Sequence, residues 1–238
     1  MSHNPVVVAP AAPGHRPSVV LSVAVSLDGY IDDTSSQRLL LSSAEDFDRV
    51  DAVRAECDAL LIGAGTLRQD NPRLLVGSEQ RRAARLARGL PAHPLKVVVS
   101  ASGDLDPGLR FWHCGGRKTV YTRSVPEAVR ERFRGTAEIV ELGPALCLPA
   151  ILDDLAAQGV RRLLVEGGGS IHTQFLEEDL ADELHVAHAP VLVGVEKAPR
   201  ILRPARFPGG TQRRMKLIDV QQLGDTVLHR YAPRGVAA

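Results

Sequence analysis

Short runs of apolar residues alternate, from Ser18 onward, with longer segments in which apolar positions recur at helical spacing. This alternation is typical of an α/β sheet that helices cover on both faces. Several runs are almost unbroken Val, Leu and Ile, as expected of central strands in a mostly parallel sheet. The predicted strands are Val19–Val25, Ala59–Ile62, Lys96–Val99, Thr119–Tyr121, Arg162–Val165, Glu183–Val186 and Thr226–Tyr231.

Helix starts are marked by capping boxes, in which a Ser or Thr is followed three residues later by Glu or Gln. Ser42-x-x-Glu45 and Ser124-x-x-Glu127 have this form, and apolar residues at helical spacing follow each of them. A third helix is predicted over Pro149–Gln158, and Gly159 is the residue expected to end it.

A short basic helix is predicted over Ser78–Gly89. Its arginines have two interpretations, a solvated face or a surface that contacts phosphate. They are Arg81, Arg82, Arg85 and Arg88.

The last part of the chain has a different pattern. The runs Val191–Val193 and Met215–Val220 follow Glu183–Val186 with turns and no long helix, and Thr226–Tyr231 comes last. We therefore expect antiparallel strands at the C-terminal edge of the sheet. No repeat or linker divides the chain, so the sequence predicts a Pro/Ala/Val-rich flexible arm over residues 1–17 and a single domain over 18–238.

Composition excludes several functional classes. The 238 residues carry a net charge of +1, which disfavours binding to nucleic acid or to an anionic membrane surface. No apolar run reaches the ~18 residues of a spanning helix, and the start lacks the pattern of a signal peptide. Three cysteines with no Cys-x-x-Cys pair indicate a reducing compartment, so a cytoplasmic protein is expected.

A glycine-rich segment after one predicted strand could bind a phosphate group. The strand Arg162–Val165 continues as Glu166-Gly167-Gly168-Gly169-Ser170, and a helix begins near Ile171. Glycines at a helix N-terminus leave backbone N–H groups open to an anion. The spacing is neither the dinucleotide fingerprint nor a P-loop. The alternative is a tight strand-to-helix turn with Ser170 as N-cap.

A second glycine-rich segment, Gly63-Ala64-Gly65-Thr66, follows the strand Ala59–Ile62. Ligands bind at the carboxyl ends of strands in open α/β sheets, and two such segments suit an extended ligand such as a dinucleotide. Asp70-Asn71-Pro72 comes shortly afterwards and is either a turn or part of the site. No metal site is expected, because the histidines lack the spacing of a zinc motif, and neither a Gly-x-Ser-x-Gly elbow nor the elements of a zinc deaminase are present.

Taken together, the ordered motifs resemble the riboflavin-biosynthesis pyrimidine reductases, the reductase domain at the C-terminal end of bifunctional deaminase/reductases. The resemblance covers about residues 18–231. The motifs are Ser26-Leu27-Asp28-Gly29-Tyr30-Ile31, Arg54 before Asp58-Ala59, Gly63-Ala64-Gly65-Thr66, Asp70-Asn71-Pro72-Arg73-Leu74, Glu166-Gly167-Gly168-Gly169, Asp182-Glu183-Leu184 and Pro190-Val191-Leu192-Val193-Gly194.

The resemblance implies a stand-alone reductase with a three-layer α/β/α, dihydrofolate-reductase-like fold, usually a homodimer. Such a protein uses NADPH to reduce the ribosyl group of an amino-ribosylamino-pyrimidinone 5′-phosphate to ribityl, and the substrate either retains or has lost its 2-amino group. The resemblance places cofactor contacts at Gly63, Gly65, Thr66, Ser100, Gly167, Gly168, Gly169, Ser170 and Ile171, with Ser102 and Arg123 as further candidates. It places substrate contacts at Ser26, Asp28, Arg54, Asp70, Leu74 and Glu166, with Asp70 as the proton relay or substrate-orienting group.

Two positions depart from the family. Many members carry Lys at the position of Tyr30 and Arg at that of Gly77, and both would help to hold a 5′-phosphate. Either Arg54, Arg81 or Arg82 replaces these two basic groups in binding the phosphate, or the substrate is a non-phosphorylated compound or one of specialised metabolism. The alternatives are a reductase of a pterin, dihydrofolate or another small heterocycle, and a catalytically silent nucleotide-binding protein.

Overall fold

The structure, a computed structural model, describes residues 16–35, 37 and 39–233. Each predicted strand except Val191–Val193 is present, and most are one or two residues longer than the apolar run that predicted them. The strands are β1 (Ser18–Ser26), β2 (Ala59–Gly63), β3 (Leu95–Val99), β4 (Lys118–Thr122), β5 (Glu138–Glu141), β6 (Arg162–Val165), β7 (Glu183–Ala189), β8 (Lys216–Leu223) and β9 (Thr226–Ala232).

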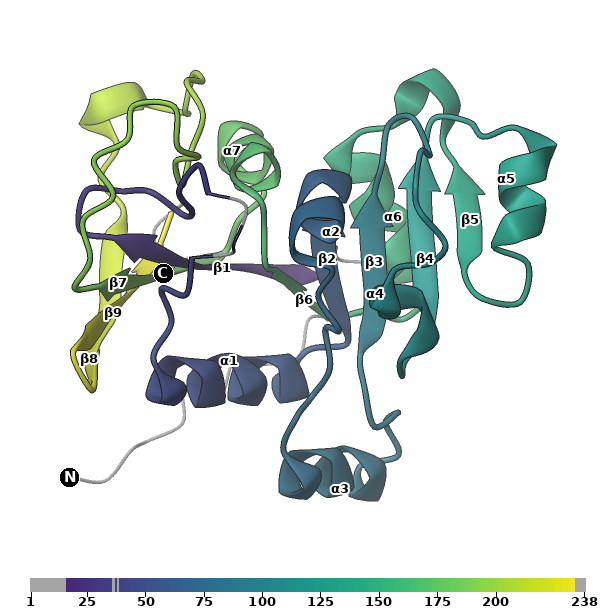
Figure 1. Cartoon of the computed structure of the whole chain (residues 1–238), viewed down its shortest axis with the longest axis horizontal. Helices are drawn as coiled ribbons and strands as arrows, with labels where there is room; N and C mark the ends of the chain where they lie inside the picture. Colours follow the sequence, from purple (N-terminus) through teal and green to yellow (C-terminus); the bar gives the residue numbers. More distant parts are fainter. Residues whose placement is uncertain (1–15, 36, 38, 234–238) are drawn as a thin grey trace.

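One nine-stranded sheet forms the centre of the molecule, in the order β5-β4-β3-β2-β6-β1-β7-β9-β8 (Figure 1). Strands β1 to β7 pair in parallel, whereas β9 runs antiparallel to both β7 and β8. This confirms the α/β class, the mostly parallel sheet and the antiparallel C-terminal edge. The strand β5 was not predicted, because it lies at the opposite edge and has exposed glutamates at both ends.

Helices cover both faces of the sheet, which confirms the three-layer arrangement. Side chains alternate along β1, so Val19 and Leu21 pack with α6 and α7 on one face while Val20 faces the other. Leu67 and Trp112 are among the buried residues of that second face. The helices are α1 (Ala44–Glu56), α2 (Ala64–Asp70), α3 (Glu79–Ala87), α4 (Arg110–His113), α5 (Glu127–Arg132), α6 (Leu148–Ala157) and α7 (Gly169–Glu177), with short 3₁₀ turns at Gly143–Ala145 and Gly210–Gln212.

Both capping-box predictions need correction. The N-cap of α1 is Ser43, whose hydroxyl accepts from the backbone N–H of Asp46, so the capping pair lies one residue later than expected. The N-cap of α5 is Pro126, which has no side chain able to cap. The backbone N–H of Val125, just before it, donates instead to the carboxylate of Glu141.

The predicted strand at Val191–Val193 is wrong, because these residues form an irregular segment. Val191 N donates to Ala189 O, while the backbone N–H groups of Val193 and of the next residue, Gly194, donate to the carboxylate of Asp28. The Asp28 carboxylate therefore accepts hydrogen bonds that the carbonyl groups of an adjacent strand would otherwise accept. Leu27 N donates to Val191 O and holds the segment against the end of β1.

Most of the predicted N-terminal arm, residues 1–15, lies outside the described residues. Arg16 donates to the backbone oxygen of Leu180 and pairs with Asp182, with an N–O distance of 3.3 Å. The division into an arm and a single domain stays a prediction. In the described part of the chain, no helix has the length and hydropathy to cross a bilayer.

A buried charge network joins β7 and β9. One oxygen of Glu183 accepts from His185 Nε2 and from Arg230, both at 2.9 Å. Burial alone would raise the pKa of Glu183, but these two hydrogen bonds lower it from 4.5 to about 2. The carboxylate is thus stabilised in its charged form.

Replacing Glu183 with Gln is expected to make the free energy of unfolding depend less on pH under acidic conditions. Because the folded pKa lies below the unfolded value, the charged carboxylate contributes stability above pH 4.5 that is lost as the pH falls toward 2. We expect a contribution of about 2 kcal/mol. Urea unfolding between pH 3 and 7 measures it, and Glu127→Gln, at an exposed position, is the matched control.

Candidate functional site

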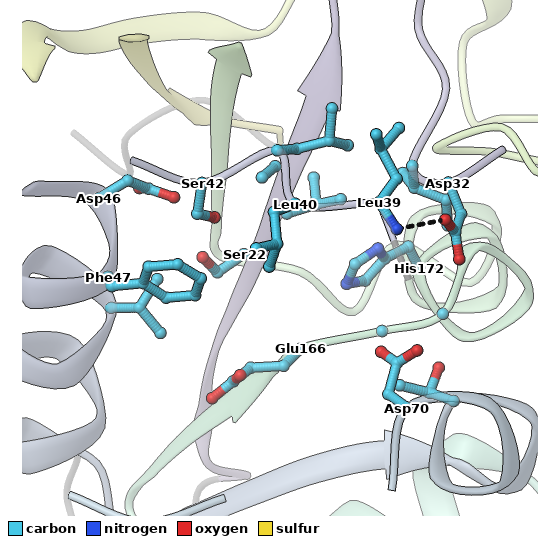
Figure 2. A pocket seen from close by; sticks show the side chains of 18 of the residues that line it. Ser22, Asp32, Leu39, Leu40, Ser42, Asp46, Phe47, Asp70, Glu166 and His172 are labelled. Atoms are coloured by element: carbon cyan, nitrogen blue, oxygen red, sulfur yellow. Dashed lines mark hydrogen bonds between the residues drawn. The ribbon is translucent and has the colours of Figure 1, made fainter. Parts of the chain in front are cut away.

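Two adjoining cavities lie at the carboxyl ends of the central strands, where open α/β sheets bind ligands. The α1 cavity is enclosed by β1, α1, residues 39–42 and the segment that follows β6 (Figure 2). The glycine cavity, of about 760 Å³, is enclosed by the starts of α2 and α7, residues 99–102 and residues 197–204. Both cavities are lined by Ile31, Asp32, Thr66, Asp70 and Gly168, so a ligand in one can meet a ligand in the other.

The two glycine-rich segments lie side by side in the structure, as predicted. Strands β2 and β6 are neighbours, and Gly63 N donates to Gly167 O at 2.8 Å. A Cβ atom at Gly63 would lie 2.9 Å from Ile171 Cγ1, and one at Gly169 would lie 2.6 Å from the backbone oxygen of Arg200. These glycines are therefore required for close packing around the cavity.

The start of α7 is open to an anionic ligand. The N-cap is Gly168, and no side chain caps the helix, so the alternative with Ser170 as N-cap is wrong. A Cβ atom at Gly65 would have no atom within 4 Å, so the cavity is open at that point. These features fit the predicted phosphate cradle.

The predicted cofactor residues come together. Gly63, Gly65, Thr66, Ser100, Gly168, Gly169, Ser170 and Ile171 line the glycine cavity, as does Ser102, while Gly167 lines the α1 cavity and Arg123 lines neither. Sequence reasoning missed the basic side chains of the glycine cavity because no motif surrounds them. They are Arg68, Lys197, Arg200 and Arg203.

Three of the predicted substrate residues line the α1 cavity: Arg54, Asp70 and Glu166. Arg54 on α1 forms a two-point ion pair with Glu166, with both N–O distances 2.6 Å, and donates to Leu75 O. Burial alone would lower the pKa of Arg54, but the Glu166 carboxylate raises it above its usual range. The pair is fixed at the floor of the cavity.

Asp70 occupies the junction between the two cavities. It is the last residue of α2, and Asn71 ends the helix in the left-handed conformation, with φ 41°. Both interpretations of the Asp-Asn-Pro motif therefore apply, since Asn71 forms the turn and Asp70 lines the site. In Figure 2, Asp70 and Asp32 approach the cavity from opposite sides.

The other predicted substrate residues line neither cavity. Leu74 is 2% exposed and belongs to the hydrophobic core. Ser26 donates to Asp28 at 2.6 Å, and this hydrogen bond lowers the pKa of Asp28 to about 2. Asp28 in turn binds the 193–194 backbone, so both side chains shape a turn. Their contact with substrate stays a prediction.

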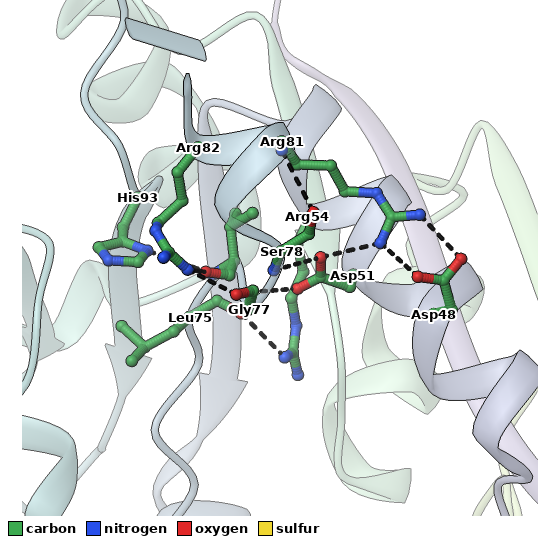
Figure 3. Close-up of polar contacts among 10 residues, drawn as sticks. Asp48, Asp51, Arg54, Leu75, Gly77, Ser78, Arg81, Arg82 and His93 are labelled. Carbon is green, nitrogen blue, oxygen red and sulfur yellow. Dashed lines mark hydrogen bonds and ion pairs between the residues drawn. The ribbon is translucent and has the colours of Figure 1, made fainter. Parts of the chain in front are cut away.

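Apart from Arg54, the basic residues considered as phosphate ligands have partners outside the cavities (Figure 3). Arg81 pairs with Asp48 and Asp51 on α1, and Arg82 donates to the backbone oxygen of Val76. Arg85 is 1% exposed and donates to backbone oxygens, so it belongs neither to a solvated face nor to a phosphate surface.

The two positions that depart from the family, Tyr30 and Gly77, line neither cavity. Arg200 donates to the Tyr30 hydroxyl at 2.7 Å, and its guanidinium stacks on the ring at 4.2 Å. Gly77 N donates to the carboxylate of Asp51. Both positions therefore support neighbouring segments in this chain.

Residues 17–229 match the RibD C-terminal domain family. The chain belongs to this family. A 2,5-diamino-6-ribosylamino-4(3H)-pyrimidinone 5′-phosphate reductase of Archaeoglobus fulgidus is 34% identical over 212 residues, which are 88% of this chain and 95% of that protein. A protein of the same name from Methanothermobacter thermautotrophicus is 31% identical over 92% of this chain and 100% of that protein.

Solved RibD structures share the fold of this RibD C-terminal domain. Acinetobacter baumannii RibD is 25% identical with a TM-score of 0.76, and the match covers 92% of this chain and 58% of that one. A pyrimidine reductase-like protein of Corynebacterium diphtheriae, 20% identical with a TM-score of 0.73, has the same fold over 91% of both chains. The family resemblance and the fold class are confirmed.

Several buried polar residues at the site of this RibD C-terminal domain were not predicted from the sequence, among them Asp32, His172 and Asp46. Asp32, 8% exposed, accepts from Gln69 Nε2 at 2.6 Å and from Leu39 N. His172, 1% exposed, bonds Val165 O through Nε2, and burial lowers its pKa to about 4, so it is neutral at physiological pH. Asp46 on α1 is fully buried. No local pattern distinguishes them from exposed polar residues.

Proposed function

We propose that the chain is an NADPH-dependent reductase that converts the ribosyl group of an amino-ribosylamino-pyrimidinone 5′-phosphate to ribityl, in riboflavin biosynthesis or a related specialised pathway. Relatives that cover most of this chain carry the name of such a reductase. The observation that carries the proposal is the junction of the two cavities at Thr66, Asp70 and Gly168. It lets a cofactor in one cavity react with a substrate in the other.

The glycine cavity suits NADPH in shape and charge. The backbone N–H groups at the start of α7 would hold the pyrophosphate, favoured by the positive end of the helix dipole. Ser100 and Ser102 would take the adenosine 2′-phosphate. The basic side chains of Arg68, Lys197, Arg200 and Arg203 give this cavity a charge that complements the phosphates.

When bound, a nicotinamide would supply a hydride to C1′ of the ring-opened ribosylamine, in which C1′ is joined to nitrogen by a double bond. Reduction of this double bond to a single bond would also require one proton at the nitrogen. Asp70, at the junction, would orient the ribose hydroxyls and relay this proton. The Arg54–Glu166 pair would hold the substrate from the floor of the cavity, and Leu39, Leu40 and Leu41 would exclude water.

The test is loss of NADPH absorbance with 2,5-diamino-6-ribosylamino-4(3H)-pyrimidinone 5′-phosphate, its 2-oxo analogue and the dephosphorylated forms. Rapid oxidation with at least one of them is expected. Turnover of dihydrofolate or a pterin alone would move the chain to another reductase class. Saturable NADPH binding with no oxidation by any of these compounds would favour a silent homologue.

We also propose a homodimer. The edge strand β8 exposes Leu217 by 51% and Val220 by 49%, which supports pairing of this face with a second copy. Light scattering after size-exclusion chromatography tests it, and a monomer at micromolar concentration would contradict it. The cytoplasmic location stays a prediction from the sequence.

Replacing Gly65 with Val is expected to weaken NADPH binding without loss of stability. The added side chain would project into the glycine cavity, where a Cβ atom meets no neighbour within 4 Å. We expect the dissociation constant of NADPH to rise by about 10-fold or more, an effect of about 1.4 kcal/mol. Fluorescence titration measures it. Ala84→Val, on the exposed face of α3, adds a similar volume and should change nothing.

A further inference from the structure

Two buried polar atoms that have no hydrogen-bond partner among the described residues belong to side chains lining the α1 cavity: Asp46 Oδ2 and His172 Nδ1. Both are acceptors. His172 donates through Nε2 to Val165 O and is neutral, so its Nδ1 carries no proton. Asp46 is a carboxylate. A buried polar group without a partner is costly, so the cavity is suited to a ligand rich in donors.

The direction of the Asp46 carboxylate is fixed by its neighbours. Arg49 donates to Oδ1 through Nε at 2.9 Å and through Nη2 at 2.7 Å, and it also donates to the hydroxyl of Ser22 at 3.2 Å. Asp46 N donates to Ser43, which fixes the first turn of α1. Oδ2 is therefore the oxygen left for a ligand.

The end of the cavity around Asp46 is suited to a flat heterocycle. Figure 2 shows the carboxylate pointing away from α1 toward the side chains of Ser42 and Ser22, with the ring of Phe47 on the same side. Hydroxyl groups donate or accept, and an aromatic ring provides an apolar surface for a base. Asp70 and Gly168 lie at the other end, where the two cavities meet.

The two forms of the pyrimidinone differ at this edge. The 2-amino form presents an amino group at C2 beside the N3–H, both of them donors. Its deaminated counterpart presents a carbonyl oxygen at C2, which a carboxylate oxygen repels. A carboxylate is therefore the group that distinguishes these edges most strongly.

We propose that Asp46 determines specificity by accepting a hydrogen bond from the 2-amino group, so that this site selects the 2-amino pyrimidinone over the 2-oxo form. The proposal rests on the function proposed above and assigns a further residue to it. Arg49 acts as a positioning residue through Oδ1. The reaction that removes the 2-amino group by hydrolysis must then follow this reduction and consume its product.

The test compares kcat/KM for the 2-amino and 2-oxo substrates in three proteins. The wild type is expected to favour the 2-amino form by about 10- to 100-fold, the range of one hydrogen bond to a charged group. In Asp46→Asn, with Arg49 on Oδ1, the amide NH₂ faces the ligand. The ratio of kcat/KM for the 2-amino substrate to that for the 2-oxo substrate should fall at least about 10-fold in this variant, because kcat/KM for the 2-amino substrate falls. Asp48→Asn, an exposed position on the same helix, should keep the wild-type ratio.

A binding measurement on the wild type keeps the proposal testable if Asp46→Asn does not fold, which its NADPH affinity and melting temperature reveal. Calorimetry of the NADP⁺-loaded protein with 2,5,6-triaminopyrimidin-4-one and 5,6-diaminouracil should show tighter binding of the first. Equal affinities, or an unchanged ratio in a folded Asp46→Asn, would overturn the role of Asp46 while leaving the reductase activity in place. Failure of the wild type to reduce either substrate would instead remove the proposed function.

Discussion

Replacing Asp70 with Ala is expected to lower kcat/KM for the pyrimidinone substrate by about 100- to 1000-fold, the range of a lost proton-transfer group. Asp70 lines both the α1 cavity and the glycine cavity, so in the proposed complex its carboxylate would lie near the reacting carbon. The affinity for NADPH should change by less than about threefold, because in the proposed complex the start of α7, and not Asp70, would hold the pyrophosphate. Steady-state kinetics and a cofactor titration measure the two effects.

Asp70→Asn separates the two possible roles of this carboxylate. An amide still forms hydrogen bonds to ribose hydroxyls but cannot relay a proton. Activity close to wild type in Asn, with loss only in Ala, would assign Asp70 to orientation. Full activity in both variants would remove Asp70 from the mechanism.

Removing either partner of the Arg54–Glu166 pair is expected to destabilise the protein, because the charge of the other partner then stays buried without a counter-charge. The two side chains are 23% and 14% exposed, and both N–O distances are 2.6 Å. Arg54→Met and Glu166→Leu should each lower the free energy of unfolding by about 2–3 kcal/mol, because each leaves a charge without its partner in a largely buried site. Urea unfolding at neutral pH measures these losses.

The double variant should be more stable than the sum of the single variants predicts, by about 1–3 kcal/mol. Removing both charges leaves no uncompensated ion. Strict additivity would contradict the coupling. The same three proteins should lose turnover even where they remain folded, because the pair forms the floor of the α1 cavity.

The location of the candidate site could be predicted from the sequence because it depends on features that the sequence shows directly, namely the buried parallel strands and the glycines that follow them. Buried parallel strands read as Val/Leu/Ile runs, and glycines at their carboxyl ends collect at one edge of the sheet. For this reason Gly63 and the segment after Glu166 lie together, as predicted, and Asp70 lies beside them.

The groups that complete the site depend on tertiary packing. Asp46 stands in the first turn of α1, where its sequence neighbours do not predict burial, yet it is fully buried beside Arg49, which donates both to its carboxylate and to Ser22 of β1. Tertiary contacts also explain why the strand predicted at Val191–Val193 is absent. An apolar run predicted a strand, but the backbone N–H of Val193 donates to the carboxylate of Asp28, which is distant in sequence.

In the proposed reaction, the junction of the two cavities brings a nicotinamide and a ribosylamine together. Reduction of the pyrimidinone substrate with NADPH deuterated at C4 tests it most directly, using each of the two C4 stereoisomers in turn. We expect one deuterium at C1′ of the ribityl product from one stereoisomer and none from the other. NADPH oxidation without deuterium at C1′ from either stereoisomer would contradict it.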